Sequence, residues 1–456
     1  MTTKAVPRVL IGAANSGAGK TTITCALIKA LLNRGLKVSS FKCGPDYIDP
    51  MFHRKVLGVN ASNLDIFMSG EEGIRYLAGT NSEGADISIM EGVMGLYDGM
   101  GFDSDLYSSN HVSLATDTPV ILIINVRGMS FSAGAIAKGF ANYKRNNIKA
   151  FILNNCSEKI YADYKALIEE CTGIPVIGHM PTIKNAEISS RHLGLVTADE
   201  IEDINEKLSL IGRQASLSVD IDRLINIAGS APPLTWNDDI SNVTGEENVA
   251  VAVSRDEAFC FIYEDNLRLL ERMGVKIKYF SPIHDSALPE DVSGMMLFGG
   301  YPELYLRQLE DNLSIREDIK EKTAQGMPVY AECGGFMYLM KGMTGSDGIE
   351  YELCGVIDST SRMTDHLVRF GYQTLEADED SMLFKKGETV NVHEFHYSDS
   401  TDNGRDLTAH KKGKSWKSSF ATDRMYAGYP HINFTAYQRS LERFIQKCAE
   451  YEKERK

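Results

Sequence analysis

The chain has 456 residues, a formal net charge of −14, and 43% hydrophobic and 24% charged residues. This length favours two domains over a single core, and the sequence contains no apolar run long enough to cross a membrane. The acidic balance argues against a nucleic-acid partner, because binding to nucleic acid needs Lys and Arg to displace counterions from the phosphates.

Over the first 200 residues, short apolar segments alternate with segments of helix length. Strands are expected at residues 8–13, 37–42, 87–90, 120–126, 150–153 and 176–177. Segments this apolar on both faces are typical of a buried parallel sheet with crossover helices. We therefore predict a mainly parallel α/β domain over residues 1–230. Residues 231–247 combine prolines, acidic residues and Asn without periodicity, which predicts a linker.

The first strand runs into the glycine-rich segment GAANSGAGKTT, and a helix ending near Arg34 follows it. Such a loop points backbone N–H groups at phosphate, while Lys20 adds a positive charge and the Thr21 hydroxyl can hold Mg²⁺. The strict phosphate-loop pattern needs a glycine where Ala14 stands, so this loop is a variant. A glycine-rich turn without a ligand is the alternative. The residues predicted to bind ATP are Gly12, Asn15, Ser16, Gly17, Ala18, Gly19, Lys20, Thr21 and Thr22.

Four carboxylates follow the strands of this domain. Asp46 and Asp49 come after the second strand, Glu91 ends the third, and Asp98 lies seven residues farther on. Carboxylates at the carboxyl ends of parallel strands face the crevice in which open α/β sheets bind ligands. We expect them to hold Mg²⁺ or to orient an acid substrate, with helix capping or turn formation as the alternative. Asn154, at the end of a later strand, is a candidate to meet a nucleotide base.

A second α/β pattern begins at residue 248. The segments NVAVAVSRD, KIKYFSP, MMLFGG and PVYAECGG predict another parallel sheet, with a helix that contains residues 266–272. The later segments GYQTLEA, VNVHEFHYS and MYAGYPHINF predict β-ribbons, and the polar residues 399–418 predict a surface excursion. With a closing helix at residues 437–451, we predict a second, mainly parallel α/β domain over residues 248–456.

Cys333 lies at a sharp glycine-rich turn between a predicted strand and a predicted helix. A nucleophile at such a corner is exposed at the sheet edge, and the helix N-terminus favours the thiolate; a buried structural cysteine is the alternative. The backbone N–H groups of Gly300 and Tyr301 are candidates for an oxyanion hole, with an ordinary glycine turn as the rival interpretation. The candidate bases are the downstream histidines His366, His393, His396 and His431.

Eight segments together resemble the cobyrinic acid a,c-diamide synthase family over essentially the whole chain. In chain order they are GAANSGAGKTT, FKCGPDYIDP, EGVMGLYDG, SSRHLGL, FGGYPEL, YAECGGFMYL, HEFHYS and AGYPHINF. The N-terminal part resembles a phosphate-loop domain of the dethiobiotin synthetase type. The C-terminal part is similar to a class I, triad-type glutamine amidotransferase domain.

The resemblance implies a glutamine-hydrolysing carbon–nitrogen ligase of cobalamin biosynthesis. In that family, ATP activates the a and c acetate carboxylates of cobyrinic acid as acyl phosphates, and ammonia from glutamine displaces the phosphate. The resemblance also implies a Mg²⁺ cofactor at Thr21, Asp46 and Glu91, with Asp49 and Asp98 as further carboxylates of the synthetase site.

For the second domain, the resemblance implies Cys333 as the nucleophile and His431 as the residue that raises its nucleophilicity. In the wider amidotransferase pattern a Glu stands two residues after the His. Here that position is Asn433, which can orient an imidazole but cannot stabilise an imidazolium by charge. The identity of the group that orients His431 is therefore not decided by the sequence.

Other functions share parts of this pattern. Nickel-sirohydrochlorin a,c-diamide synthase has both domains and these motifs, and the cobyric acid synthase branch shares the architecture but amidates other side chains. A non-catalytic phosphate-loop switch ATPase would have no use for Cys333 and His431.

Eight scattered cysteines and the lack of a signal peptide predict reduced thiols and a cytoplasmic location. The expected partners are ATP, glutamine and cobyrinic acid, with neither nucleic acid nor a membrane. A homodimer is left open.

Overall fold

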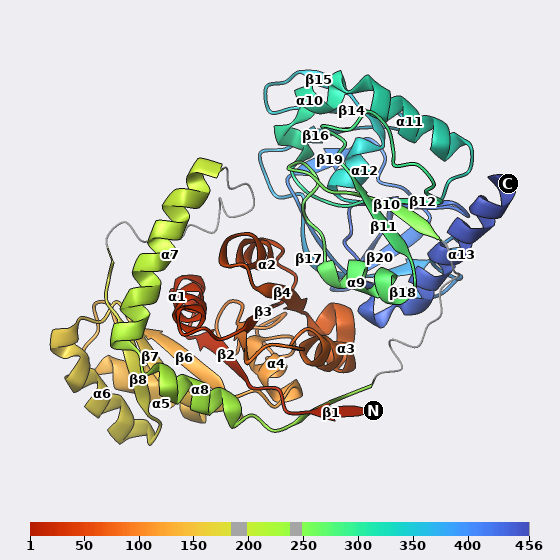
Figure 1. The fold of residues 1–456 in the computed structure, drawn as a ribbon. Coiled ribbons are helices and arrows are strands. Elements are labelled where there is room, and N and C mark those ends of the chain that lie inside the picture. Colours follow the sequence, from red (N-terminus) through yellow and green to blue (C-terminus); the bar gives the residue numbers. More distant parts are fainter. Residues whose placement is uncertain (184–197, 238–248, 456) are drawn as a thin grey trace. The chain divides into compact units, whose positions relative to one another are not determined.

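The computed structural model describes residues 1–183, 198–237 and 249–455. The chain divides into two compact units, Met1–Asp238 and Asp239–Lys456, each with its own hydrophobic core (Figure 1). Each unit is built on a mainly parallel sheet, which confirms the predicted α/β class. Among the described residues, no helix has the length and apolar character needed to cross a membrane.

Unit 1 contains a seven-stranded sheet in which every pair of neighbours is parallel. In spatial order its strands are β4 (Asn60–Leu64), β3 (Val38–Cys43), β5 (Ile87–Glu91), β2 (Arg8–Ala13), β6 (Val120–Asn125), β7 (Ile148–Asn154) and β8 (Val176–Met180). The apolar runs predicted all of them except β4. That strand reads NASNL and has too few apolar residues to stand out.

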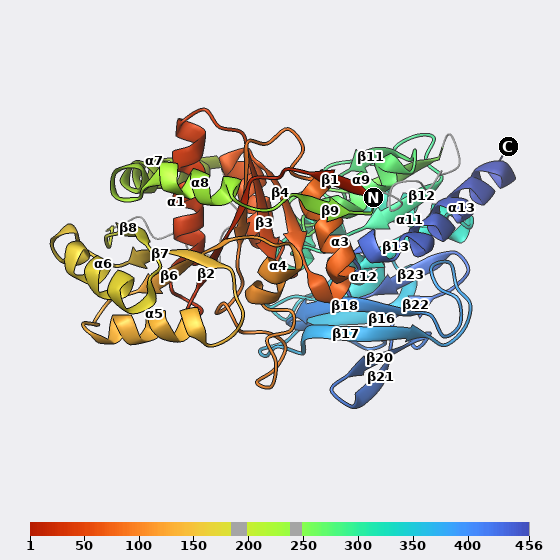
Figure 2. The ribbon, with the colours of Figure 1, turned by 90° about the horizontal axis from the view of Figure 1, so that it is seen from below.

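Helices cover both faces of this sheet, as Figure 2 shows. On one face, alternate strand residues such as Val9, Ile11 and Ala13 pack in a common core with α1 (Lys20–Asn33), α7 (Ala198–Ser218) and α8 (Ile221–Gly229). The other face carries α4 (Ser109–Ala115), α5 (Ser132–Asn142) and α6 (Glu158–Thr172). A short α2 (Ile48–Phe52), a π-helical turn η1 (His53–Leu57) and α3 (Ile66–Thr80) flank β4.

The predicted linker begins too early. Residues Leu234–Trp236 form β9, which pairs antiparallel with β1 (Thr2–Lys4). Trp236 is buried against α3, so closely that a Cβ at Gly79 would lie 2.6 Å from its ring. This apolar anchor holds the start of the predicted linker in unit 1. The rest of the linker, and the motif SSRHLGL, lie outside the described residues.

Unit 2 contains a six-stranded sheet whose neighbours are parallel except for the last pair. In spatial order its strands are β11 (Lys276–Phe280), β10 (Ala250–Ser254), β12 (Gly294–Leu297), β13 (Val329–Glu332), β23 (Met425–Gly428) and β22 (Phe420–Ala421). The segment MYAG was predicted as part of a ribbon, but it is β23, an inner strand of this sheet that pairs parallel with β13. Its Tyr426 and Ala427 are fully buried, which only a strand covered on both faces allows.

Two four-stranded sheets complete unit 2. One has the order β15 (Glu350–Glu352), β14 (Met340–Thr344), β16 (Ile357–Met363) and β19 (Ser398–Ser400). The other has the order β18 (Thr389–His396), β17 (Arg369–Ala377), β20 (Leu407–Lys411) and β21 (Lys414–Ser418). The surface excursion predicted at residues 399–418 is therefore wrong for β20, whereas β21 is largely exposed. Leu407 and Ala409 anchor β20 in the core, while its backbone pairs with β17.

The helices of unit 2 frame the central sheet. They are α9 (Glu264–Arg272), η4 (Pro302–Leu304), α10 (Leu306–Asp311), α11 (Leu313–Ala324), α12 (Gly334–Tyr338), η5 (Phe434–Ala436) and the closing α13 (Gln438–Arg455). The short η4 and α12 are the first helices after β12 and β13, respectively. They place the FGGYPEL and YAECGGFMYL motifs at the carboxyl ends of two neighbouring parallel strands.

Candidate functional site

The glycine-rich loop of unit 1 lies between β2 and α1, as predicted, and its shape depends on glycine. Gly17 and Gly19 have φ angles of 76° and 94°, which favour glycine. A Cβ on Gly19 would also lie 2.2 Å from Nδ2 of Asn154. That amide donates to the carbonyl of Ala18 at 2.8 Å, so Asn154 holds the loop itself.

Lys20 is buried at the start of α1. Its ammonium donates to the backbone carbonyls of Asn15, at 3.2 Å, and of Met94. Burial, followed by the nearby Lys42, lowers the pKa of Lys20 to about 8. A phosphate ligand would add the negative charge that stabilises its protonated form.

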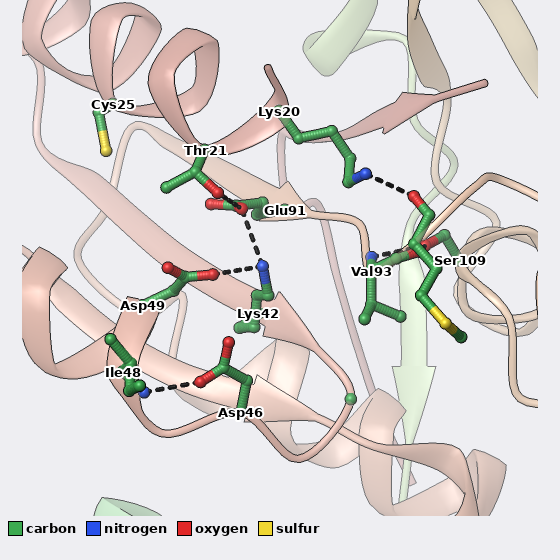
Figure 3. A network of polar contacts seen from close by, with 12 residues as sticks. Lys20, Thr21, Cys25, Lys42, Asp46, Ile48, Asp49, Glu91, Val93 and Ser109 are labelled. Carbon is green, nitrogen blue, oxygen red and sulfur yellow. Dashed lines mark hydrogen bonds and ion pairs between the residues drawn. The ribbon is translucent and has the colours of Figure 1, made fainter. Parts of the chain in front are cut away.

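A buried cluster of charged groups lies beside this loop, and we call Thr21, Lys42, Asp49 and Glu91 the carboxylate cluster. The Thr21 hydroxyl donates to Oε1 of Glu91 at 2.7 Å, and Nζ of Lys42 donates to the same oxygen at 2.8 Å. Lys42 also forms an ion pair with Asp49, so that it bridges the two carboxylates (Figure 3). The structure thus brings together three of the predicted residues, and the fourth, Lys42, was not predicted.

The charged groups of the carboxylate cluster shift one another's pKa values. Burial raises the pKa of Glu91 to about 7, and Asp49 adds to this rise while Lys42 opposes it. Burial alone would lower the pKa of Lys42, but Glu91 and Asp49 outweigh it and raise that pKa. A lysine between Phe41 and Cys43 in strand β3 is the signal that could have revealed Lys42, because a buried ammonium needs carboxylate partners.

The other two predicted carboxylates have local backbone roles. Oδ1 of Asp46 accepts the backbone N–H of Ile48 at 2.9 Å, and Oδ2 of Asp98 accepts that of Gly95 at 2.8 Å. These are the turn-forming contacts given as the alternative. Asp46 nevertheless lies near enough to Asp49 for the negative charge there to raise its pKa, after the larger effect of burial.

The carboxylate cluster suits a hard divalent cation. Within the described residues, Oδ1 of Asp49 and Oε2 of Glu91 are buried without a hydrogen-bond partner, and the two carboxylates repel each other. Oxygen ligands of this kind suit Mg²⁺, which keeps several waters and shares substrate phosphates with one or two carboxylates. The same part of the chain contains no group of three or more His, Cys, Asp or Glu arranged to hold a metal alone.

In unit 2, Cys333 lies in a strained turn between β13 and α12. Its φ and ψ angles are 48° and −106°, which is rare for a residue with a Cβ. Gly335 makes the turn feasible, since a Cβ there would lie 2.3 Å from the carbonyl oxygen of Leu297. Strain of this kind projects a nucleophile from the end of a strand.

His431 is the predicted histidine that the fold places against Cys333. The two side chains interact directly, and Nδ1 of His431 lies 2.9 Å from Oε1 of Glu332. Burial lowers the pKa of His431, but Glu332 and Cys333 outweigh it and raise this pKa to about 10. An imidazolium beside a cysteine stabilises the nucleophilic thiolate.

The other candidate histidines are engaged elsewhere. His393 pairs with His431 through the backbone, and burial lowers its pKa to about 3. His396 contacts Glu394 at 2.7 Å, while His366 is exposed beside Asp365.

Glu332 is the group that orients His431, and the sequence analysis missed it. Its carboxylate also accepts the Tyr330 hydroxyl and, at 3.3 Å, the backbone N–H of Ile432. Asn433, which stands at the position of the usual Glu, instead caps η5 by accepting the N–H of Thr435 at 3.0 Å. The signal was a carboxylate in an apolar strand directly before the cysteine.

The predicted oxyanion hole needs one correction. The N–H of Tyr301 donates to the carbonyl of Ala258 at 2.9 Å, so it is not free for a ligand. Gly300 does face the nucleophile turn, because a Cβ on Gly334 would lie 3.0 Å from the Gly300 nitrogen. Gly334 is the first residue of α12, where an N–H group has no acceptor within the helix. Gly300 and Gly334 are the better pair of donors.

Comparisons with known proteins match one family model to each unit of the chain. The family model described as a CobQ/CobB/MinD/ParA nucleotide binding domain matches residues 9–196, and that of a CobB/CobQ-like glutamine amidotransferase domain matches residues 250–438. The cobyrinate a,c-diamide synthase of Caldanaerobacter subterraneus subsp. tengcongensis is 38% identical over 97% of this chain and 98% of its own length.

Two further relatives carry the same name. The cobyrinate a,c-diamide synthase of Thermoplasma volcanium is 38% identical, covering 99% of both chains, and that of Listeria monocytogenes serotype 4b is 40% identical, covering 95% of this chain and 97% of its own. Among solved structures, PurLQS from Thermotoga maritima aligns at 14% identity with a TM-score of 0.32, covering 45% of this chain and 99% of that chain.

Proposed function

The chain belongs to the cobyrinate a,c-diamide synthase family, and we propose that it uses ATP and glutamine to amidate the a and c acetate carboxylates of cobyrinic acid. The observation that carries this proposal is the presence, on one chain, of a phosphate loop beside a buried carboxylate cluster and of a Cys333–His431–Glu332 triad. A nucleotide switch would need only the first of these sites. An amide synthesis driven by ATP and glutamine needs both.

In unit 1, the proposed chemistry turns a carboxylate into a good leaving group. An oxygen of the substrate carboxylate attacks the γ-phosphorus of ATP, ADP departs, and an acyl phosphate forms. Ammonia then attacks the acyl carbon and phosphate leaves. Lys20 and Lys42 offset the negative charge on the phosphoryl oxygens. Mg²⁺, held by Thr21 with Glu91 and Asp49, would supply further charge neutralisation and orient the phosphates.

In unit 2, the triad would release ammonia from glutamine. The sulfur of Cys333 attacks the carboxamide carbon, and the oxyanion that forms accepts hydrogen bonds from the N–H groups of Gly300 and Gly334. His431 donates its proton to the departing ammonia. Water then hydrolyses the thioester, with His431 as the base, and glutamate is released. Glu332 stabilises the imidazole of His431 whenever it carries a proton on both nitrogens.

A comparison of substrates tests this proposal. Purified protein is incubated with ATP, Mg²⁺ and glutamine together with either cobyrinic acid or nickel-sirohydrochlorin, and the products are analysed by mass spectrometry. We expect two successive exchanges of an acid for an amide on cobyrinic acid and none on the nickel compound. Amidation of nickel-sirohydrochlorin alone would assign the chain to the sister activity, and amidation of neither would overturn the proposal.

Replacing Glu332 with Gln tests the triad assignment. The amide keeps a hydrogen bond to His431 but cannot stabilise the imidazolium, so kcat/KM for glutamine hydrolysis should fall by about 10²- to 10⁴-fold. Glutamate release measures the effect. Asn433→Ala, which removes only the cap of η5, is the matched control and should cost less than about tenfold. Equal losses in the two variants would contradict the role of Glu332.

A further inference from the structure

The short helix η4 follows the oxyanion loop and packs against the nucleophile turn. Cδ of Pro302 lies 3.1 Å from the place where a Cβ on Gly334 would sit, and Pro302 is buried. Leu304, at the other end of η4, is 56% exposed. Glu303 lies between these two residues, three positions after Gly300, whose nitrogen faces the nucleophile turn.

The Glu303 side chain is in an unusual electrostatic position. It is only partly exposed, and burial raises its pKa to about 7. Within the described part of the chain, its carboxylate makes no ion pair or hydrogen bond with another side chain, and only its own backbone N–H contacts it. Removing a carboxylate from water without giving it a partner costs free energy. A cationic ligand would offset this desolvation cost.

The chemistry of the neighbouring reaction suggests which cation this is. Glutamine places its carboxamide at the nucleophile, and its α-ammonium group lies at the far end of the molecule. We propose that the carboxylate of Glu303 binds this α-ammonium group and thereby selects glutamine over amides that lack it. The inference rests on the proposed use of glutamine by unit 2. It adds a specificity residue that neither the triad nor the oxyanion donors provide.

The energetic consequence is specific to the charged group. An ion pair in a partly desolvated site discriminates strongly against an analogue without the charge, because the carboxylate is then left unpaired. A glutamine analogue without the α-amino group, glutaramate, retains both the carboxamide and the carboxylate. We therefore expect the unchanged protein to prefer glutamine over glutaramate by about 10²-fold or more in kcat/KM.

The test compares the two amides in Glu303→Gln. Release of ammonia is measured from glutamine and from glutaramate, in the full chain with its other substrates present. The expected result is a loss of about 10²-fold for glutamine, mainly through KM, with glutaramate hydrolysis changed less than about threefold. The preference between the amides should thus nearly vanish. Glu303→Asp, which keeps the charge on a shorter side chain, should restore part of it.

Glu317→Gln provides the matched control, because Glu317 is exposed on α11. It should leave the preference for glutamine unchanged. If Glu303→Gln loses activity toward both amides in parallel, or keeps the preference, Glu303 does not bind the α-ammonium group and the inference is overturned. If the unchanged protein releases no glutamate from glutamine, it is the proposed function that fails.

Discussion

Replacing Cys333 with Ala should abolish amide formation from glutamine, by at least about 10⁴-fold, while amide formation from added ammonia stays within about threefold of the unchanged protein. The sulfur is the atom proposed to attack the carboxamide, and no other group at the turn can replace it. The acyl phosphate is proposed to form in unit 1, which the substitution does not touch. Ammonia supplied from solution should therefore bypass the defect.

The measurement compares product formed with glutamine and with an ammonium salt at a pH where free ammonia is present. Cys171→Ala serves as the matched control, since Cys171 lies on α6 in unit 1 and has no part in the proposed chemistry. It should keep both activities. Thermal unfolding of Cys333→Ala should stay cooperative. Alanine carries a Cβ as cysteine does, so the substitution does not change the backbone strain of the turn. Equal loss with both nitrogen sources in a folded variant would contradict the division of labour.

Replacing Lys20 with Ala should abolish amide formation from both nitrogen sources, by at least about 10³-fold. Its ammonium donates to the backbone carbonyls of Asn15, in the loop, and of Met94, and it is proposed to contact the phosphates of ATP. Without it, the charge that develops on the transferred phosphoryl group loses a fixed positive partner. We expect neither glutamine nor ammonia to compensate, because in the proposed mechanism both act after the acyl phosphate has formed.

Lys138→Ala is the matched control, since Lys138 is exposed on α5, and it should keep both activities. Product formation with each nitrogen source measures the effect, and hydrolysis of glutamine by Lys20→Ala shows that unit 2 is folded. Ammonia-driven synthesis that survives in Lys20→Ala would refute the assignment of the phosphate loop.

Contiguous motifs were predictable because their chemistry depends on neighbours in the sequence. The loop from Gly12 to Thr22 joins a buried strand to a helix as predicted, and Cys333 lies at the predicted corner. Apolar runs also revealed most strands of both parallel sheets. Apolar runs did not predict β4, because its residues are largely polar. They also did not predict β20 and β21, whose pairing depends on backbone hydrogen bonds more than on side-chain polarity.

Residues that are distant in the sequence but in contact in the fold were harder to predict. The sequence indicated that Cys333 needs a histidine and offered four, and only the fold places His431 against it. Glu332 follows from the same geometry, because its carboxylate reaches His431 across 99 positions in the chain. Lys42 likewise bridges Asp49 and Glu91 from a neighbouring strand.

By itself, then, the sequence determined the α/β class, the phosphate loop, the cysteine turn and the family resemblance, since each is written in adjacent residues or in the order of motifs. Tertiary structure alone decided which carboxylates join Lys42 and which form turns, and that Glu332 rather than Asn433 orients His431. It also showed that the N–H of Tyr301 is already engaged. The physical reason is that burial and charge pairing depend on which strands are neighbours, and spacing along the chain does not encode this.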